Sequence, residues 1–433
     1  MAIALRPFLD LLPFRLDQRF AGPALRRWRI RRRRKMLGVM AAALPGQKRC
    51  LYVDLAVISR HDAGTGIQRV VRALALALAL TDAPAEQWDV RFVAADRRRP
   101  YHVISWPEAG KSIDRTPIEA RPGDVFLGLD FSLDTVRFHR AQLARFRRAG
   151  GSLWFLVCDL LPAERPEWFS VNNVIRYKAW LEIIAGIADG FLCISQQTED
   201  DLRRVLADRF RLEEGYATRI VPMGHAIMDS MLQEAAAAAP PTARFDITQP
   251  FSLMVGTLEP RKGHADIVAA FSEMWRQGSE HRLVLVGRMG WQIEALRDTI
   301  RNHPEHGNKL MWFDDVGDLE LEQIYQACEG VIIGSHAEGF GLPLIEALGH
   351  LKPVLARDLP IFRIHEERGV RYFPAAGDAA MLGACIRNWV TDIRLGRAVV
   401  TAPDANWKKS AAVILDALDD QSEPAALLIR ATA

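Results

Sequence analysis

The sequence has no run of about 20 apolar residues, which is the length that an α-helix needs to cross a bilayer. The apolar segment MLGVMAAAL, from Met36 to Leu44, is only nine residues long, and no cleavable signal is evident around it. We therefore expect a protein that is soluble or attached to a membrane surface. The expected location is cytoplasmic, including the inner face of the cytoplasmic membrane.

Patterns typical of metal sites are also missing. The five cysteines form an odd set without close pairs, the histidines are scattered, and Asp-x-Asp does not occur. The sequence therefore predicts no metal site and no cofactor. Cys158 and Cys193 lie inside apolar, strand-like runs, which is typical of reduced thiols in a core and indicates a reducing compartment.

From about residue 50 the chain does contain a regular alternation of apolar β-branched runs and helix-period segments. This alternation is typical of parallel sheets covered by helices. It predicts the α/β class, with two Rossmann-like, doubly wound parallel-sheet domains facing across a ligand cleft. The predicted strands begin at Leu51, Asp124, Ser152, Gly190 and Arg219 in the first domain, and at Phe251, Arg282, Lys309, Gly330 and Lys352 in the second.

A break separates the two series of strands. It runs from Glu234 through five alanines to Pro240 and Pro241. Pro and small residues in a row are typical of a connection between domains. The predicted parts are a basic arm at 1–49, an N-terminal Rossmann-like domain at 50–240, a C-terminal Rossmann-like domain at 248–400 and a C-terminal helical segment at 401–433.

The stretch GSHAEGFGLPLIEA, Gly334 to Ala347, follows a strand and so lies where open α/β sheets bind ligands. Gly339 and Gly341 let the backbone approach a ligand, and the helix that follows favours an anion such as phosphate at its start. Glu338 and Glu346 suit the vicinal hydroxyls of a sugar, because an ionised carboxylate accepts two hydrogen bonds. The combination indicates a sugar nucleotide. Taken alone, however, the pair of glutamates is a weak signal, and Glu346 also fits the simpler role of complementing the helix dipole.

A second loop, EPRKG from Glu259 to Gly263, also leaves a strand end. Arg261 and Lys262 supply a fixed guanidinium and a compact ammonium, which would stabilise the charge that develops on a departing diphosphate. The alternative is a solvated turn.

Three segments in this order, VGTLEPRKGHADIVAAF, GSHAEGFGLPLIEAL and KPVLARDLPIF, resemble the retaining glycosyltransferases of family four, which have the GT-B fold. The resemblance spans most of residues 51 to 415 and is more specific in the second half. It implies that 50–240 is the acceptor domain and 248–400 the donor-nucleotide domain. It extends to ANWKKSAAVILDAL, Ala405 to Leu418, which resembles the helix that crosses back to the N-terminal domain. Such enzymes generally use basic side chains and helix ends in place of a metal ion, with the sugar nucleotide as a substrate.

The resemblance implies a role for each motif residue. Arg261 and Lys262 would hold the diphosphate, Glu338 would face the transferred sugar, and Glu346 would bind the ribose hydroxyls. The implied donor-binding residues are Gly256, Arg261, Lys262, Glu338, Gly339, Phe340, Gly341, Leu342 and Glu346, and the implied catalytic residues are Glu338, Arg261, Lys262 and Asp159.

In the first half, SRHDAGTGIQRVVRAL resembles the glycine loop of the family, and the resemblance places Gly64, Thr65, Gly66 and Arg69 at the cleft. Its helix is expected to begin near Ile67 and to bury Ile67, Val70, Val71, Leu74 and Leu78. VCDLLPAERPEWF resembles the acceptor-side loop, and Asp159 is the candidate there.

The chain departs from the family pattern near the expected cleft. Cys158 stands where many relatives have histidine, Leu351 replaces a glycine, and Arg357 replaces a serine. Met223 and His225 also differ from the residues common after the hinge strand. Such changes either retune donor choice or reflect drift at tolerant positions.

RRWRIRRRRK, residues 26–35, carries eight positive side chains in ten. With Trp28 and Ile30 interleaved, and with the apolar FLDLLPFRL from Phe8 beside it, the segment favours an anionic membrane surface. Nucleic-acid binding and a disordered solubilising tail are the alternatives, and we expect no nucleic-acid partner.

The predicted function is a retaining hexosyl transfer from a sugar nucleotide to a glycan or polyprenyl-linked acceptor in bacterial surface or exopolysaccharide synthesis. GDP-mannose is the first expected donor, because TGIQRVVRAL with DLLP most resembles mannosyltransferase-type members. UDP-glucose or another UDP-hexose comes second. A UDP-sugar epimerase and a glycan-binding scaffold without turnover remain open.

Overall fold

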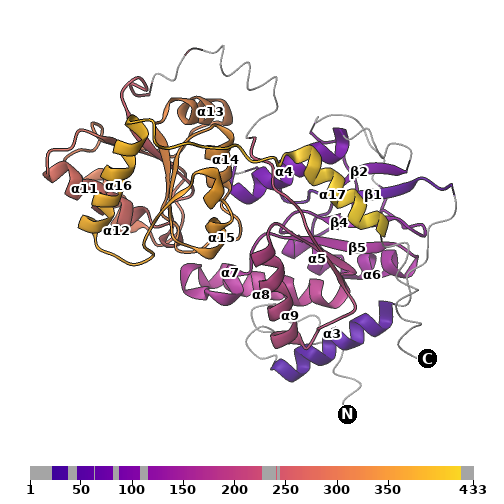
Figure 1. Cartoon of the computed structure of the whole chain (residues 1–433). Coiled ribbons are helices and arrows are strands. Elements are labelled where there is room, and N and C mark those ends of the chain that lie inside the picture. The colour runs from indigo at the N-terminus through magenta and orange to yellow at the C-terminus, as the bar shows by residue number, and fades with distance from the viewer. Residues whose placement is uncertain are drawn as a thin grey trace. The chain divides into compact units, whose positions relative to one another are not determined.

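The structure, a computed structural model, describes residues 22–37, 46–62, 64–80, 87–107, 116–226, 240 and 244–420 (Figure 1). The chain divides into two compact units. One comprises Met1–Pro222 with Trp407–Ala433, and the other comprises Met223–Asn406. The predicted apolar segment 8–16, residues 234–239 of the predicted break and residues 421–433 lie outside the described residues.

The division after Pro222 comes earlier than the alanine run on which the sequence placed the boundary. The contacts of His225 give the reason. Its Nδ1 lies 2.8 Å from the carbonyl oxygen of Ala405, and its ring packs against Gly349, and both residues belong to the second unit. The chain returns to the first unit at Trp407 rather than at residue 401.

In the described residues, the first unit contains a seven-stranded sheet of order β3-β2-β1-β4-β5-β6-β7. Its strands are parallel except for β3, which pairs antiparallel with β2. The strands are β1 (Arg49–Asp54), β2 (Trp88–Ala94), β3 (His102–Val103), β4 (Val125–Gly128), β5 (Ser152–Val157), β6 (Gly190–Cys193) and β7 (Ala217–Ile220). Sequence reasoning did not identify β2, although the polar–apolar alternation in WDVRFVA is typical of a half-buried strand, and β3 is too short to show a pattern.

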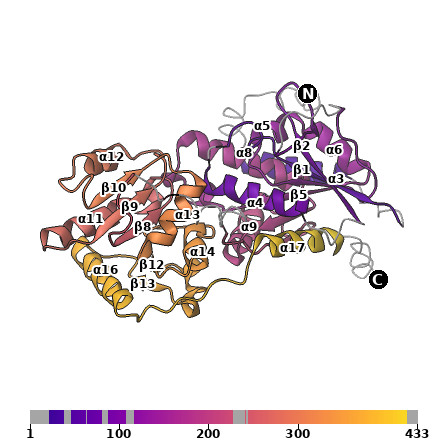
Figure 2. The same ribbon diagram turned by 90° about the horizontal axis from the view of Figure 1, so that it is seen from above.

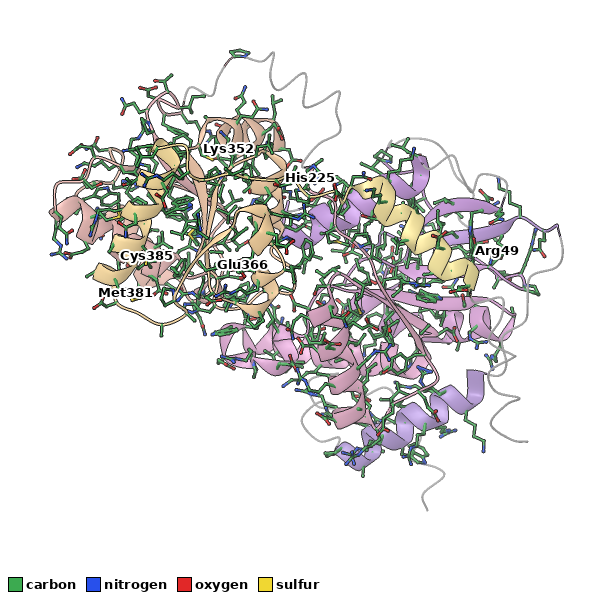
Figure 3. All side chains as sticks on the ribbon, in the orientation of Figure 1. Arg49, His225, Lys352, Glu366, Met381 and Cys385 are labelled. Atoms are coloured by element: carbon green, nitrogen blue, oxygen red, sulfur yellow. The ribbon has the colours of Figure 1, made fainter. Side chains whose placement is uncertain are left out.

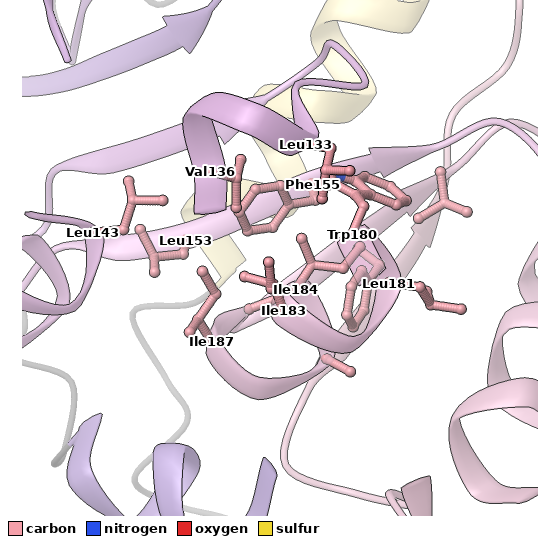
Figure 4. Packing of buried hydrophobic residues seen from close by; sticks show 14 of the residues in the cluster. Leu133, Val136, Leu143, Leu153, Phe155, Trp180, Leu181, Ile183, Ile184 and Ile187 are labelled. Carbon is pink, nitrogen blue, oxygen red and sulfur yellow. The ribbon is translucent and has the colours of Figure 1, made fainter. Parts of the chain in front are cut away.

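Helices cover this sheet, and their apolar faces form a continuous core. Figure 4 shows Phe155 of the sheet packed among Leu133, Val136, Trp180 and Ile184, all of them buried. Burial of such side chains is the main favourable term in folding. The helices are α3 (Pro23–Leu37), α4 (Gly66–Leu80), α5 (Leu133–Phe138), α6 (Arg140–Arg148), α7 (Leu161–Glu164), η1 (Pro166–Trp168), α8 (Val171–Ile187), α9 (Gln196–Phe210) and α17 (Trp407–Asp419).

Helix α4 begins at Gly66, as expected, but its buried face differs from the predicted one in one residue. Val70, Val71, Leu74 and Leu78 are buried, whereas Ile67 is 43% exposed. Ile67 lies in the first turn of α4, and its neighbour Gln68 is buried instead.

The basic segment is part of the first unit and not a separate tail. It forms helix α3, which packs against α8 and α9. Ile30 is buried, and Arg34 donates hydrogen bonds to the carbonyl oxygens of Ala185 (3.0 Å) and Ala188 (2.9 Å) at the end of α8. Arg29 is also buried, 3.8 Å from Glu182. A solubilising tail is therefore wrong for residues 22–37, and Arg29 and Arg34 serve packing.

The second unit contains a parallel six-stranded sheet of order β10-β9-β8-β11-β12-β13, again in the described residues. Helices α11 and α16 lie on one face, and α13 and α14 lie on the other (Figure 2). The strands are β8 (Phe251–Val255), β9 (Arg282–Val286), β10 (Leu310–Phe313), β11 (Gly330–Ile333), β12 (Val354–Arg357) and β13 (Arg371–Phe373). The helices are η2 (Pro260–Lys262), α11 (His264–Arg276), α12 (Glu294–Arg301), α13 (Asp318–Ala327), α14 (Leu342–Gly349), α15 (Pro360–Arg363), η3 (Glu366–Arg368) and α16 (Ala379–Arg394).

Helix α17 lies in the first unit beside α4 (Figure 1). Ser410 is buried and donates a hydrogen bond to the carbonyl of Pro222 (2.5 Å). At the other end of the helix, Arg49 pairs with Asp419; Figure 3 labels Arg49. Among the described residues, no helix is both long and apolar enough to cross a membrane.

Candidate functional site

The strand order of the second unit brings the two motif loops together. Strands β8 and β11 are adjacent and parallel, although β9 and β10 lie between them in sequence. From β8 the strand order runs one way to β9 and β10 and the other way to β11, β12 and β13, so the order reverses between β8 and β11. Ligands of open α/β sheets bind at such a switch point, beyond the carboxyl ends of the strands. The EPRKG loop leaves β8 and the GSHAEGFG loop leaves β11, so both loops lie at the switch point.

Close approach of these loops depends on Gly263. Its φ is +70°, and a Cβ atom there would lie 2.1 Å from the carbonyl oxygen of Gly334. Gly341, at the start of α14, has φ +94° and lies against the ring of Phe362. Only glycine suits both demands at these two positions, since a side chain would clash and the backbone is left-handed.

Glu338, Arg261 and Lys262 form one ion cluster. Glu338 Oε1 lies 2.5 Å from Lys262 Nζ, and Glu338 Oε2 lies 2.9 Å from Arg261 Nη1. Ser335 Oγ donates a third hydrogen bond to Glu338 Oε1 (2.7 Å). The Glu338 side chain is 9% exposed, and the Arg261 and Lys262 side chains are 12% and 14% exposed, so their charges interact with little screening by water.

The cluster keeps Glu338 ionised. Burial alone would raise the pKa of Glu338, but the charges of Lys262 and Arg261 and the hydrogen bonds from Lys262 and Ser335 lower that pKa to about 2. At neutral pH the carboxylate therefore accepts hydrogen bonds and cannot donate a proton. This excludes Glu338 as a general acid in the arrangement that the structure has.

Glu346 lies further along, within α14, and is buried. Its Oε2 accepts a hydrogen bond from the hydroxyl of Tyr325 (2.9 Å) in α13. The ring of His350 stacks on Tyr325, and His350 Nδ1 lies 3.4 Å from Glu322. Glu346 is thus held by a side chain from a neighbouring helix, separately from the Glu338 cluster.

The other predicted donor residues surround these carboxylates. Gly256 follows β8 with φ +147°, beside the Lys262 side chain. Gly339, Phe340 and Leu342 are partly exposed, and Gly341 is buried.

Five of the predicted residues belong to the first unit. Gly64, Thr65 and Gly66 are exposed, and Arg69 is half-buried in α4. Thr65 Oγ1 lies 3.2 Å from Gln68 Oε1, which ties the loop to the helix that it begins. At Asp159, the Oδ1 atom accepts a hydrogen bond from the amide of Leu161 (3.1 Å), so this side chain also caps the turn after β5.

Sequence reasoning missed three residues that contact the predicted site residues. Glu259 is 3% exposed and pairs with Arg261 (2.5 Å), and its place in the same EPRKG motif was the available signal. Burial raises the pKa of Glu259, against the lowering effect of Arg261 and Lys262. Ser335 and Tyr325 carried no such signal, because their contacts depend on tertiary structure. Among the described residues, no group of three or more His, Cys, Asp or Glu side chains is placed to hold a metal ion.

Comparison with known proteins connects these loops to a family. Residues 239–432, which include both motif loops, match the family described as glycosyl transferases group 1. The chain is 31% identical over 350 residues to a serotype-specific mannosyltransferase, WbdA, from Escherichia coli, across 79% of this chain and 41% of that relative. The chain thus spans less than half the length of the curated relatives that it matches over most of its own length.

Solved structures of glycosyltransferases share the fold. Sucrose-phosphate synthase from Thermosynechococcus elongatus superimposes with a TM-score of 0.55 at 19% identity, over 89% of this chain and all of that one. WaaG, a glycosyltransferase involved in lipopolysaccharide biosynthesis, has a TM-score of 0.52 at 14% identity, over 86% of this chain and 98% of that chain. The fold is accordingly GT-B, with two Rossmann-like units.

Proposed function

We propose that this protein is a retaining glycosyltransferase that moves a hexose from a sugar nucleotide to a glycan acceptor in bacterial polysaccharide synthesis. The observation that carries the proposal is the cluster of Arg261, Lys262 and Glu338 at the switch point of the second unit. Similarity to mannosyltransferases supports the same activity.

In this proposal, Arg261 and Lys262 bind the donor diphosphate and stabilise the charge that develops on it as the glycosidic bond breaks. Both cations already face Glu338 in the structure. An incoming diphosphate would share them with Glu338, which then orients the hydroxyls of the transferred sugar as an ionised acceptor. The start of α14 adds partial positive charge on the same side.

Glu346 would hold the ribose hydroxyls, and its bond from Tyr325 would orient the carboxylate for them. Gly256, Gly339, Phe340, Gly341 and Leu342 would provide the backbone wall of the donor site. Because the two cations neutralise the diphosphate, no metal ion is required. Asp159 is assigned to the acceptor side, and Gly64, Thr65, Gly66 and Arg69 are assigned to the ligand-facing glycine loop and helix start of the first unit. We infer GDP-mannose as the first donor, in line with the mannosyltransferase relatives, and a UDP-hexose as the second.

We further propose a lipid-linked acceptor and attachment to the inner face of the cytoplasmic membrane. Support comes from the outer side of α3, where Trp28, Arg31, Arg32 and Lys35 are exposed. The guanidinium of Arg32 lies 5.3 Å from the Trp28 ring centre, so an aromatic side chain and three cations share one surface. Aromatic and basic side chains together are typical of surfaces that bind anionic lipid.

A panel of sugar nucleotides tests the activity. Purified protein is incubated with GDP-mannose, UDP-glucose and other donors, and release of nucleoside diphosphate is measured with and without a lipid-linked glycan. We expect acceptor-dependent release with one donor. Release of a new sugar nucleotide without acceptor would instead indicate an epimerase, and binding without release would indicate a scaffold.

Lys262→Ala tests the assigned role of the cation. Turnover should fall by roughly a hundredfold or more, because a charge that acts on the leaving group is lost. Lys408→Ala, which removes an exposed lysine of α17, is the matched control. Equal rates of diphosphate release from Lys262→Ala and the parent would refute the assignment.

A further inference from the structure

Arg357, which stands where the family resemblance expects serine, joins three segments beneath the donor loops. It is the last residue of β12 and is 5% exposed. Its Nε donates to the carbonyl oxygen of Gly334 (2.9 Å), where the Glu338 loop begins. Its Nη1 donates to the carbonyl of Ala375 (2.7 Å), and its Nη2 lies 2.5 Å from Asp266 Oδ2. The planar guanidinium therefore serves three acceptors at once from three separate nitrogen atoms held in a fixed fork. Serine has a single donor, and the three donors of lysine all sit on one nitrogen atom.

Asp266 extends this connection to the second donor loop. It lies in the first turn of α11, immediately after the EPRKG loop, and the same Oδ2 atom lies 3.2 Å from His336 Nε2. The backbone amide of His336 in turn donates to the carbonyl of Arg261 (2.8 Å). Arg357, Asp266 and His336 thus link the loop that carries Glu338 with the loop that carries the two cations.

We propose that Arg357 is a positioning residue that fixes the distance between the two donor loops through Asp266 and His336. The inference rests on the proposed function for its kinetic readout, since it assigns Arg357 no contact with a substrate. The expected consequence concerns the donor. Because Arg357 bonds to both loops, Glu338, Arg261 and Lys262 keep their relative positions when a diphosphate competes for the cations.

The physical reason is that the direct ion pairs cannot hold the loops by themselves during binding. The bonds of Glu338 to Arg261 and Lys262 are the ones that an incoming anion would weaken. The bonds of Arg357 go to Gly334, Asp266 and Ala375, so an anion at the cations leaves them in place. A buried charge with three partners keeps its geometry, because losing any one of them is costly.

Arg357→Ser, Arg357→Lys and Asp266→Asn test the proposal, with Arg363→Ser as the control. Arg363 is an arginine of the same unit that pairs with Asp358 and Glu366 on the surface. KM and kcat are measured for GDP-mannose and for the acceptor, and backbone hydrogen exchange is followed in peptides covering 259–266 and 334–341. Thermal unfolding reports the folded fraction.

In Arg357→Ser we expect the donor KM to rise on the order of tenfold to a hundredfold, with acceptor KM unchanged. Exchange should increase in both loop peptides, Asp266→Asn should act in the same direction, and Arg357→Lys should recover part of the donor affinity. Arg363→Ser should match the parent.

Unchanged exchange and unchanged donor KM in Arg357→Ser would overturn the proposal. A loss of apparent kcat that follows the folded fraction, with donor KM constant, would also overturn it, since that result describes a purely structural residue. If the parent turns over no donor at all, the proposed function is contradicted, and the exchange comparison still decides whether Arg357 fixes the loops.

Discussion

Leu351 holds a backbone conformation that glycine adopts more easily. Its φ is +53°, and its side chain is 60% exposed. The amide of Leu351 donates to Leu348 and that of Lys352 donates to Ala347, which is the hydrogen-bond pattern of a helix that ends through a left-handed residue. Glycine, which the family resemblance expects at this position, adopts this left-handed conformation without strain. The Cβ atom of Leu351 makes the same conformation strained.

Leu351→Gly should accordingly stabilise the protein by about 0.5–1 kcal/mol, because relief of the left-handed strain exceeds the extra chain entropy of glycine. Chemical denaturation of the two proteins measures the difference. Turnover should be unchanged. A destabilised glycine variant would show that Leu351 makes a compensating contact.

The depressed pKa of Glu338 predicts how stability depends on pH. The folded value is about 2, below the ordinary value of 4.5, so the stabilisation is complete above pH 4.5 and is lost as the pH falls towards 2. The difference corresponds to about 3 kcal/mol. Between pH 5 and pH 2 the unfolding free energy of Glu338→Gln should therefore fall by about 3 kcal/mol less than that of the parent.

Urea denaturation across this pH range measures the effect. Glu367→Gln, which removes an exposed carboxylate in the same unit, is the control for general acid effects. If Glu338→Gln and Glu367→Gln lose stability in parallel with acid, the ion cluster does not hold the carboxylate as the structure indicates.

At the scale of elements, helix α3 has two sides with different tasks. The last carbonyl oxygens of a helix have no partner within the helix, and Arg34 donates hydrogen bonds to two of them at the end of α8. It also donates to the carbonyl oxygen of Gly215 (2.8 Å). Arg34→Ala should therefore destabilise the first unit by about 2–3 kcal/mol, as measured by thermal or chemical unfolding. An unchanged stability would mean that water replaces the guanidinium without cost.

The outer side of α3 should act on membranes and not on stability. Replacing Arg31, Arg32 and Lys35 together by alanine should lower binding to anionic liposomes by roughly a hundredfold, because each cation contributes about 1 kcal/mol near the surface. The unfolding free energy should stay within about 0.5 kcal/mol of the parent. Sedimentation with liposomes measures the binding, and equal sedimentation of parent and variant would remove the support for a membrane role.

At the scale of the whole molecule, the C-terminal helix completes the first unit. Ala411, Ile414 and Leu418 of α17 are buried, and the helix packs beside α4. Ile414→Ala should cost about 2–4 kcal/mol through the cavity that it leaves. Hydrogen exchange should then increase in β1 and α4 but not in β8 and β11. Increased exchange in both units would contradict the division of the chain.

Much of this architecture follows from local pattern. Apolar runs and helix periodicity identified ten of the strands near their observed positions. Pro343 and Ile67 marked the starts of α14 and α4 to within one residue. The EPRKG and GSHAEGFG motifs were correctly paired, because the family resemblance and strand-end logic pointed to the same place. Residue pairs such as Tyr325 with Glu346 were not predictable, since the partners come from different helices.

By itself, the sequence determined the α/β class, the two series of strands and the residues of the two motif loops, because periodicity and loop composition are properties of neighbouring residues. Only the tertiary structure decided that Arg29 and Arg34 are packing residues, that Arg357 bonds to both Gly334 and Asp266, and that the chain crosses to the second unit after Pro222. These outcomes depend on burial between segments far apart in the chain, where a buried charge must find its partners and no local pattern specifies them.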